Sequence, residues 1–259
     1  MSLQENKALR LDRLLASNAL GSRKEVKQWI REGRLSLHGQ VLTRPETAIA
    51  PSDWAAIRLD GEPLQLGDRL YFMLHKPTGY LSAMEDRQQA CLAELVPENW
   101  RQKHIAPVGR LDRDSSGLLL LTNDGQLAHR LLSPRWGVWK YYRFHYAGEP
   151  LGPAEVEACA QGLDLGDFLT RPALLRPLAP GLAELTVHEG KFHQVRRMVQ
   201  KLGREIQDLH RWRQGPLELG GLELGSWRPL SEAEVQALRA CCAEKPQGGS
   251  PEGPDPGHH

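Results

Sequence analysis

Residues 109–125 have the sequence GRLDRDSSGLLLLTNDG, in which a charged loop leads into an apolar run and then into a turn. The four leucines at 118–121 are typical of a short strand that is buried on both faces. Asn, Asp and Gly follow them, and these residue types tolerate the backbone angles of a tight turn. The segment therefore predicts a buried strand whose preceding loop carries charged side chains.

One carboxylate of this loop, Asp112, lies between Arg110 and Arg113. A carboxylate held between cations stays ionised, and an ionised carboxylate can attack carbon as a nucleophile. The alternative is a structural Asp that is salt-bridged within its loop. The loop alone leaves both interpretations open.

Two further segments join charged residues to predicted elements. The strand-like run at 70–74 precedes Lys76, Pro77 and Gly79, of which the last two favour a tight bend. Residues 190–198 read GKFHQVRRM and open a predicted helix that ends near Gly203. Its apolar residues recur at i, i+3, i+4 and i+7, which is typical of one buried helical face. Further strands are predicted at 140–146 and 184–188, and further helices at 126–132, at 153–161 and from 231.

Residues 8–60 are predicted to form a separate module. Two short helices, the second opened by a capping box at Ser22 and Glu25, precede a hairpin at 35–42. Nine Lys/Arg stand against three Asp/Glu between Lys7 and Arg44, a surplus that favours binding of phosphates over a merely solvated helix face. The cations expected to bind RNA are Arg23, Lys24, Lys27 and Arg31.

This module resembles the small RNA-binding domain of the ribosomal protein S-four type, on the evidence of residues 11–15 and 22–39. Residues 61–69 are predicted to be a linker, and residues 70–243 a catalytic domain. Residues 244–259 contain no apolar side chains to bury, so they are predicted to be a disordered tail.

The segments 76–79, 109–117 and 190–198, in this order, resemble the motifs of the pseudouridine synthases, in the branch typified by RsuA, RluB, RluE and RluF. The resemblance implies an α+β protein. Its small N-terminal α/β-hairpin RNA-binding domain is followed by a catalytic domain with a mainly antiparallel central sheet flanked by helices. It also implies that the reaction needs no cofactor, because the isomerisation is redox-neutral.

The same resemblance implies roles for individual residues. Asp112 corresponds to the catalytic carboxylate, and Arg196, directly after His-Gln-Val, to its basic partner. A Tyr near the uracil corresponds to Tyr142, with Tyr141 as the alternative register, and a slip of one residue would turn the side chain to the other face of the strand. The residues expected to contact substrate RNA around the site are Arg110, Arg113, Lys76 and Arg197.

The implied reaction converts a specific uridine of 16S (small-subunit) rRNA to pseudouridine. The base must first leave the helical stack, because the glycosidic bond cannot be reached inside one. Whether Asp112 attacks the ribose or the uracil stays open. One alternative is a 23S (large-subunit) rRNA enzyme of the same branch. The other is a non-catalytic RNA-binding assembly factor, which the presence of Asp112 and Arg196 argues against.

Composition agrees with a folded protein that binds RNA locally. The 259 residues are 40% hydrophobic, and the formal net charge is only +1. Seven Lys/Arg stand against two Asp/Glu between Lys191 and Arg213, so basic patches rather than overall charge would bind a polyanion.

Four cysteines without Cys-x-x-Cys spacing, together with an N-terminus that lacks an apolar signal core, favour a cytoplasmic protein. Scattered histidines argue against a metal site, and no apolar stretch reaches membrane-spanning length. The expected partner is ribosomal RNA or a pre-ribosomal particle, with no membrane, and the expected state is a monomer.

Overall fold

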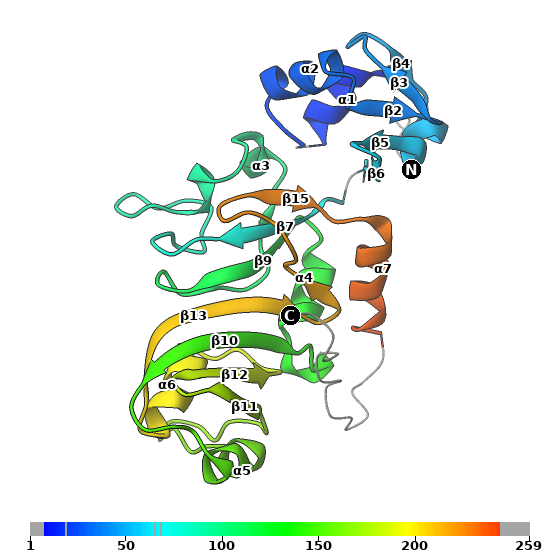
Figure 1. Cartoon of the computed structure of the whole chain (residues 1–259). Helices are drawn as coiled ribbons and strands as arrows, with labels where there is room; N and C mark the ends of the chain where they lie inside the picture. The colour runs from blue at the N-terminus through cyan, green and yellow to red at the C-terminus, as the bar shows by residue number, and fades with distance from the viewer. Residues whose placement is uncertain (1–7, 19, 65, 68, 244–259) are drawn as a thin grey trace. The chain divides into compact units, whose positions relative to one another are not determined.

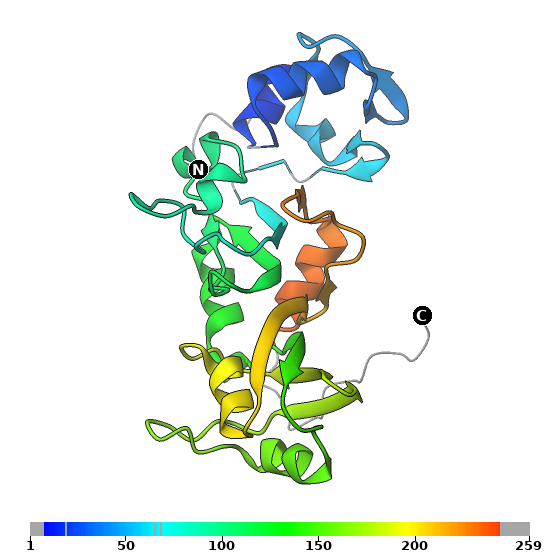
Figure 2. The same cartoon turned by 60° about the vertical axis from the view of Figure 1, so that its left-hand side comes forward.

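The leucine run at 118–121 lies in strand β9 (Ser116–Thr122) of the computed structural model of this chain, which describes residues 8–18, 20–64, 66–67 and 69–243. The predicted tail at 244–259 lies outside the described residues. Two units are distinguished. The first takes the described residues up to Ala128 together with Leu219–Ala237, and the second takes His129–Glu218 with the described residues from Leu238. Figures 1 and 2 show the elements of both units from two directions.

Strand β9 pairs antiparallel with β7 (Tyr71–Lys76) in the first unit, and β7 pairs on its other side with β15 (Trp227–Pro229). These three strands lie side by side in Figure 1. The short strand β8 (Ala106–Pro107) also pairs with β9. Residues 117–122 are all buried, which confirms the prediction of a strand buried on both faces.

Aromatic residues form the core beside this sheet. The Phe72 ring stacks on Trp100 at 4.1 Å between centroids and meets Trp227 edge-on at 5.5 Å. Such pairs add about 0.5–1.5 kcal/mol beyond the burial of their area. The helical elements associated with the first unit are η2 (Leu92–Glu94), α3 (Asn99–Gln102), α4 (Gly125–Leu132) and α7 (Glu232–Ala240), of which the last two extend past the unit's bounds.

The N-terminal module, blue in Figures 1 and 2, packs two helices on each other beside a small sheet. Helix α2 begins after Ser22 with the predicted capping box, since the Ser22 hydroxyl accepts from the Glu25 amide and the Glu25 carboxylate accepts from the Ser22 amide. The helices are α1 (Leu11–Ser17), α2 (Arg23–Arg31) and the 3-10 helix η1 (Pro51–Ala56). The strands are β1 (Leu9–Arg10), β2 (Leu35–Leu37), β3 (Gln40–Leu42), β4 (Ala48–Ile49), β5 (Ile57–Leu59) and β6 (Glu62–Pro63).

The sheet of this module is larger than the predicted hairpin. Four strands run in the order β3-β2-β5-β6, and β1 pairs with β4 separately. Within the predicted linker at 61–69, Glu62 and Pro63 form β6 against β5. Two exposed or half-buried residues carry no apolar signal, so the sequence did not identify this edge strand.

Four antiparallel strands in the order β11-β12-β10-β13 form the sheet of the second unit, and β14 pairs with the C-terminal end of β13. Helix α6 packs against β13, and helix α5 packs against β11. The strands are β10 (Lys140–Ala147), β11 (Leu174–Ala179), β12 (Leu182–Val187), β13 (Glu205–Gln214) and β14 (Leu217–Glu218). The helices are η3 (Pro134–Trp136), α5 (Pro153–Gln161) and α6 (Gln194–Lys201).

Candidate active site

Hydrogen bonds to the backbone fix the loop that carries Asp112. The Ser82 hydroxyl donates to the Leu111 carbonyl at 2.7 Å and accepts from the Leu111 amide at 3.0 Å. The Gly79 amide donates to the Arg113 carbonyl at 2.7 Å, and the Ser115 amide donates to the Asp112 carbonyl at 3.1 Å. The backbone on both sides of Asp112 is therefore held by partners, while the residue itself is only half-buried.

Lys76, at the end of strand β7, supports the same loop through its side chain. Its side chain has no exposed surface, and its ammonium group donates to the carbonyl oxygens of Pro77 at 3.0 Å, Asp112 at 3.0 Å and Ser115 at 2.9 Å. An ammonium group has three protons to donate, so each has an acceptor. In the described structure this buried ammonium serves the backbone of the loop, so contact of Lys76 with RNA stays a prediction.

The two arginines that flank Asp112 are both exposed. The Arg113 Nε donates to the Gly79 carbonyl at 3.2 Å, which adds a side-chain tie between the loop and the bend at 77–79. Arg110 follows Gly109, whose φ of +82° lies in the left-handed region that favours glycine. Both guanidinium groups are accessible to a polyanion.

Tyr142 lies in β10 of the second unit and is 8% exposed. Its hydroxyl oxygen accepts from Arg211 Nη1 at 3.3 Å, and Arg211, on the neighbouring strand β13, is itself 2% exposed. The neighbouring Lys140 is also buried. Burial lowers the pKa of Lys140 to about 8, and the Arg211 charge acts in the same direction. This face of β10 therefore holds a phenol beside two buried basic groups.

Tyr141, the alternative register, points to the opposite face of β10, because side chains alternate along a strand. Its ring lies 5.6 Å from that of Trp212, with the Arg213 guanidinium 4.8 Å from its centroid. The two tyrosines thus have different partners, although both are buried.

Arg196 lies in the first turn of α6 and is half-buried. Buried contacts hold this end of the helix: the Gln194 side chain accepts from the Lys191 amide at 3.0 Å and donates to the Glu189 carboxylate at 2.7 Å. Val195, Met198 and Val199 are buried, as their spacing predicted. The next arginine, Arg197, forms an ion pair with Asp167 and donates to the Leu165 carbonyl, so part of its donor capacity serves the fold.

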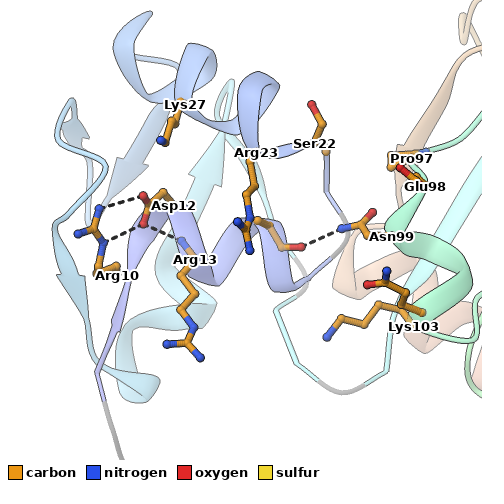
Figure 3. Close-up of a pocket in the computed structure, with 13 residues that line it drawn as sticks. Arg10, Asp12, Arg13, Ser22, Arg23, Lys27, Pro97, Glu98, Asn99 and Lys103 are labelled. Atoms are coloured by element: carbon orange, nitrogen blue, oxygen red, sulfur yellow. Dashed lines mark hydrogen bonds and ion pairs between the residues drawn. The ribbon is translucent and has the colours of Figure 1, made fainter.

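A basic groove of about 750 Å³ lies in the first unit, between the helices of the N-terminal module and the segment around α3. Such a volume is in the usual range of ligand sites, about 300–1,000 Å³. Figure 3 shows Arg23 among its lining residues, and Lys103 extending from the α3 side toward α1. The Asn99 amide group bridges to the Ala16 carbonyl at 2.9 Å and connects the two sides. The charged lining residues are Arg10, Asp12, Arg13, Arg23, Lys27, Glu98 and Lys103.

The acidic residues of the groove do not cancel its cations. Arg10 donates to Asp12 at 3.1 and 3.0 Å, and this side-chain hydrogen bond lowers the pKa of Asp12. The pair neutralises itself, which leaves four cations against Glu98. Of the α2 cations predicted to bind RNA, Arg23 and Lys27 line the groove, whereas Lys24 and Arg31 are exposed on α2 outside it.

Sequence reasoning did not identify Ser82, Lys103, Lys140 or Arg211. Ser82 and Lys103 carry no motif, so only the fold reveals their contacts. The pattern of β13 could have indicated Arg211, since Leu209 and Arg211 alternate in the strand as the residues of one buried face do.

No group of three or more His, Cys, Asp and Glu residues suited to a metal occurs in the part of the chain that the structure describes. Within those same residues, no helix has the length and apolar character needed to cross a membrane.

Comparison with known proteins gives the family. Residues 70–201 match the model of the RNA pseudouridylate synthases, and residues 9–54 match the S4 domain. An uncharacterized RNA pseudouridine synthase of Bacillus subtilis, YtzG, is 39% identical over 89% of this chain and 98% of its own length. Ribosomal small subunit pseudouridine synthase A of Pseudomonas aeruginosa is 39% identical over 88% of this chain and 99% of its own.

Ribosomal large subunit pseudouridine synthase B of Bacillus subtilis is 35% identical over 89% of this chain and 96% of its own length. A solved structure described as a pseudouridylate synthase is 34% identical, covers 89% of this chain and 99% of its own, and superposes with a TM-score of 0.61. The Asp112 loop, the supporting Lys76 bend and the N-terminal RNA-binding module thus occur in a chain that belongs to the RNA pseudouridylate synthase family.

Proposed function

We propose that this enzyme isomerises one specific uridine of 16S rRNA to pseudouridine, acting as a monomer on free rRNA or on a pre-ribosomal particle. Support comes from the small-subunit synthase at 39% identity. A uridine of 23S rRNA is the second candidate, because a large-subunit synthase covers as much of the chain at 35% identity. Both candidates share the chemistry that follows.

The observation that carries the chemistry is the fixed loop around Asp112. Ser82 and Gly79 bind backbone groups of its neighbours and Lys76 binds its own carbonyl, while Asp112 itself is half-exposed. A nucleophile on a fixed backbone needs little reorganisation when it attacks, which lowers the barrier. We therefore assign Asp112 as the nucleophile.

In the proposed reaction Asp112 attacks the nucleotide, and the bond between the ribose C1′ and the uracil N1 breaks. The uracil turns and its C5 bonds to C1′, and the bond between the nucleotide and Asp112 breaks, which frees the carboxylate. The C5 proton is lost while N1 regains one, so atoms and electrons balance. Arg196 acts as the basic partner of the carboxylate, because a guanidinium can hold a carboxylate with two parallel hydrogen bonds. Tyr142 contacts the uracil.

RNA binding is assigned to the basic groove and to the exposed arginines of the Asp112 loop. Cations that neutralise phosphates release counterions, so binding is expected to weaken steeply with salt. Arg110 is proposed to fill the space that the extruded base leaves in the RNA helix. Arg113 is proposed to contact the adjoining backbone.

The target is tested by pseudouridine mapping of total RNA from cells with and without the gene, followed by reaction of the purified protein with isolated 16S and 23S rRNA. The proposal expects one pseudouridine to disappear from 16S rRNA and to be restored in vitro. Loss of a site from 23S rRNA alone would select the second candidate.

The chemistry is tested with Asp112→Asn, which keeps the size of the side chain and removes the ionised nucleophile. Turnover is expected to fall by many orders of magnitude, with RNA affinity kept within about tenfold, equivalent to about 1.4 kcal/mol. Asp114→Asn is the matched control, since Asp114 is an exposed carboxylate two residues along the same loop. Near-normal turnover in Asp112→Asn would falsify the assignment of the nucleophile, whereas no turnover by the wild-type protein on any rRNA would favour a non-catalytic assembly factor.

A further inference from the structure

The loop before α6 exposes an aromatic side chain that contributes little to the core. Phe192 is 70% exposed, the highest value among the large hydrophobic side chains in the described part of the chain. Burying a phenylalanine would stabilise a fold by about 1.5–3 kcal/mol. The fold forgoes most of this stabilisation at Phe192. By contrast, Trp136, Trp139, Trp212 and Trp227 are all half-buried.

Phe192 is held in a defined geometry. Its ring stacks on that of His193, with 3.9 Å between centroids and 15° between planes. His193 has φ +49° and ψ +29°, the left-handed region that non-glycine residues rarely occupy. The backbone therefore places two adjacent rings parallel, and both side chains are exposed. One face of the Phe192 ring is covered by His193, and most of the remaining surface is open.

A cation lies beside these rings. Lys191 directly precedes Phe192 in this loop, and its side chain is exposed. Its ammonium group lies 3.9 Å from the centroid of the Phe168 ring. Arg197 also faces Phe168, at 5.1 Å, but its ion pair with Asp167 neutralises it. Lys191 is thus the cation at this surface that is placed to meet a phosphate.

We propose that the Phe192–His193 ring pair binds one unpaired base of the substrate RNA other than the target uridine, with Lys191 contacting an adjacent phosphate. An exposed flat ring beside a cation suits single-stranded nucleic acid, since every base has a stacking face. The site would select RNAs that present an unpaired base at a fixed distance from the target. This proposal rests on the proposed function only in that the substrate is RNA, and it does not depend on whether that RNA is 16S or 23S rRNA.

The charge around the site favours RNA over a protein partner. Of the seven Lys/Arg between Lys191 and Arg213, three are paired with carboxylates (Arg197, Arg204 and Arg213) and Arg211 is buried, so the exposed cations that suit a polyanion are Lys191 and Lys201. The exposed apolar side chains near this loop are Phe192 and Leu169, which is 66% exposed. Two such side chains are fewer than the apolar centre of a stable protein interface contains.

The test measures the affinity of full-length enzyme for a substrate fragment in which single nucleotides around the target are replaced, one at a time, by abasic ones. The fragment comes from whichever RNA the mapping identifies, so a failed 16S assignment leaves the test intact. The wild type is expected to lose about 5- to 150-fold in affinity at one abasic position, the range for one base–aromatic stack.

Phe192→Ala should bind the intact fragment that much more weakly and should lose nothing further at that position. Phe192→Tyr should restore the affinity, because it restores the ring. Leu224→Ala, at a side chain that is 62% exposed in the first unit, is the control and should match the wild type.

The proposal is overturned if Phe192→Ala binds the intact fragment within twofold of the wild type. It is also overturned if the variant is weaker by one constant factor on the intact and on every abasic fragment, since that pattern indicates no coupling to any base. Melting temperatures of the variants accompany the binding data, and an exposed side chain predicts that they stay unchanged.

Discussion

Replacing Lys76 by Met tests the support of the Asp112 loop. Met keeps roughly the length and the apolar stem of the side chain but removes the ammonium and its three hydrogen bonds. A hydrogen bond to a charged group contributes about 1.5–3 kcal/mol net, so three would give about 4.5–9 kcal/mol. Removing a buried charge returns several kcal/mol of desolvation free energy. The difference, about 2–4 kcal/mol, is the expected destabilisation.

For a domain of this size, that loss corresponds to a fall in melting temperature of about 4–16 °C. The carbonyls of Pro77 and Ser115 lose their ammonium partner, whereas the Asp112 carbonyl keeps the Ser115 amide. The loop should therefore shift rather than unfold. A displacement of about 1 Å in a catalytic group costs about 100-fold in rate, so kcat should fall by roughly that factor.

The assay is thermal unfolding together with single-turnover kinetics, measured well below the melting temperature of the variant. Lys24→Met is the matched control, because Lys24 is exposed on α2 and its loss should leave stability unchanged. Lys76→Met with a melting temperature within about 1 °C of the wild type and a rate within about twofold would refute the reasoning.

Three further outcomes are expected. Because the pKa of Lys140 is lowered in the folded protein, the unfolded chain binds more protons than the folded chain between about pH 8 and 10.5. The free energy of unfolding should therefore rise across that window by about 3 kcal/mol. Denaturant unfolding of Lys140→Met should lack this rise. Arg196→Met should lower kcat with little change in RNA affinity, and Arg196→Lys should be milder, as single-turnover rates and binding curves will measure. The double variant in which Gln replaces the groove cations Arg23 and Lys27 should show a slope of log affinity against log salt that is smaller by about 1.5–2.

Each of these outcomes has a contrary result. Parallel stability–pH curves for the wild type and Lys140→Met would remove the buried amine as the cause. Weaker RNA binding by Arg196→Met, with kcat unchanged, would assign that residue to the RNA backbone. For the groove, the comparison is the double Gln variant of Lys24 and Arg31, which lie outside it. An equal change of slope in both double variants would mean that the whole face of α2 binds RNA.

The elements that the sequence predicted well have strong local signals. The leucine run of β9, the capping box of α2 and the bounds of α5 follow from residue type and spacing alone, and the structure confirms them. The capping box at Ser231 and Glu234 likewise opens α7, as predicted. In each case the decisive contact lies within a few residues of chain.

One long strand that the sequence missed, β13, carries polar side chains on its buried face. Strand β13 buries Arg211 and Gln214 together with Leu209, so its buried positions alternate with half-buried ones but do not form the apolar face that predicts a strand. The burial of Lys76 was missed for the same reason. A lysine beside a bend reads as a surface residue, and only the fold reveals the three carbonyls that surround it.

Placing Asp112, Tyr142 and Arg196 in one reaction rests on motif resemblance, since they lie far apart in the chain and no local pattern connects them. The structure confirms the elements that carry each residue. Their joint action stays a prediction until the variants of Asp112 and Arg196 are measured.

The contacts at Gly79 and Ser82 have a consequence for how this enzyme family can vary. They tie residues 79–82 to residues 111–113, so the ends of the intervening stretch 83–110 are fixed independently of its length. Doubling the length of a flexible loop adds only about 0.6 kcal/mol of closure entropy. The exposed residues 85–89 of this stretch can therefore lengthen or shorten between related enzymes without displacing the nucleophile, whereas α3 is anchored by the packing of Trp100 on Phe72. Recognition of a new RNA can evolve here while the chemistry is left in place.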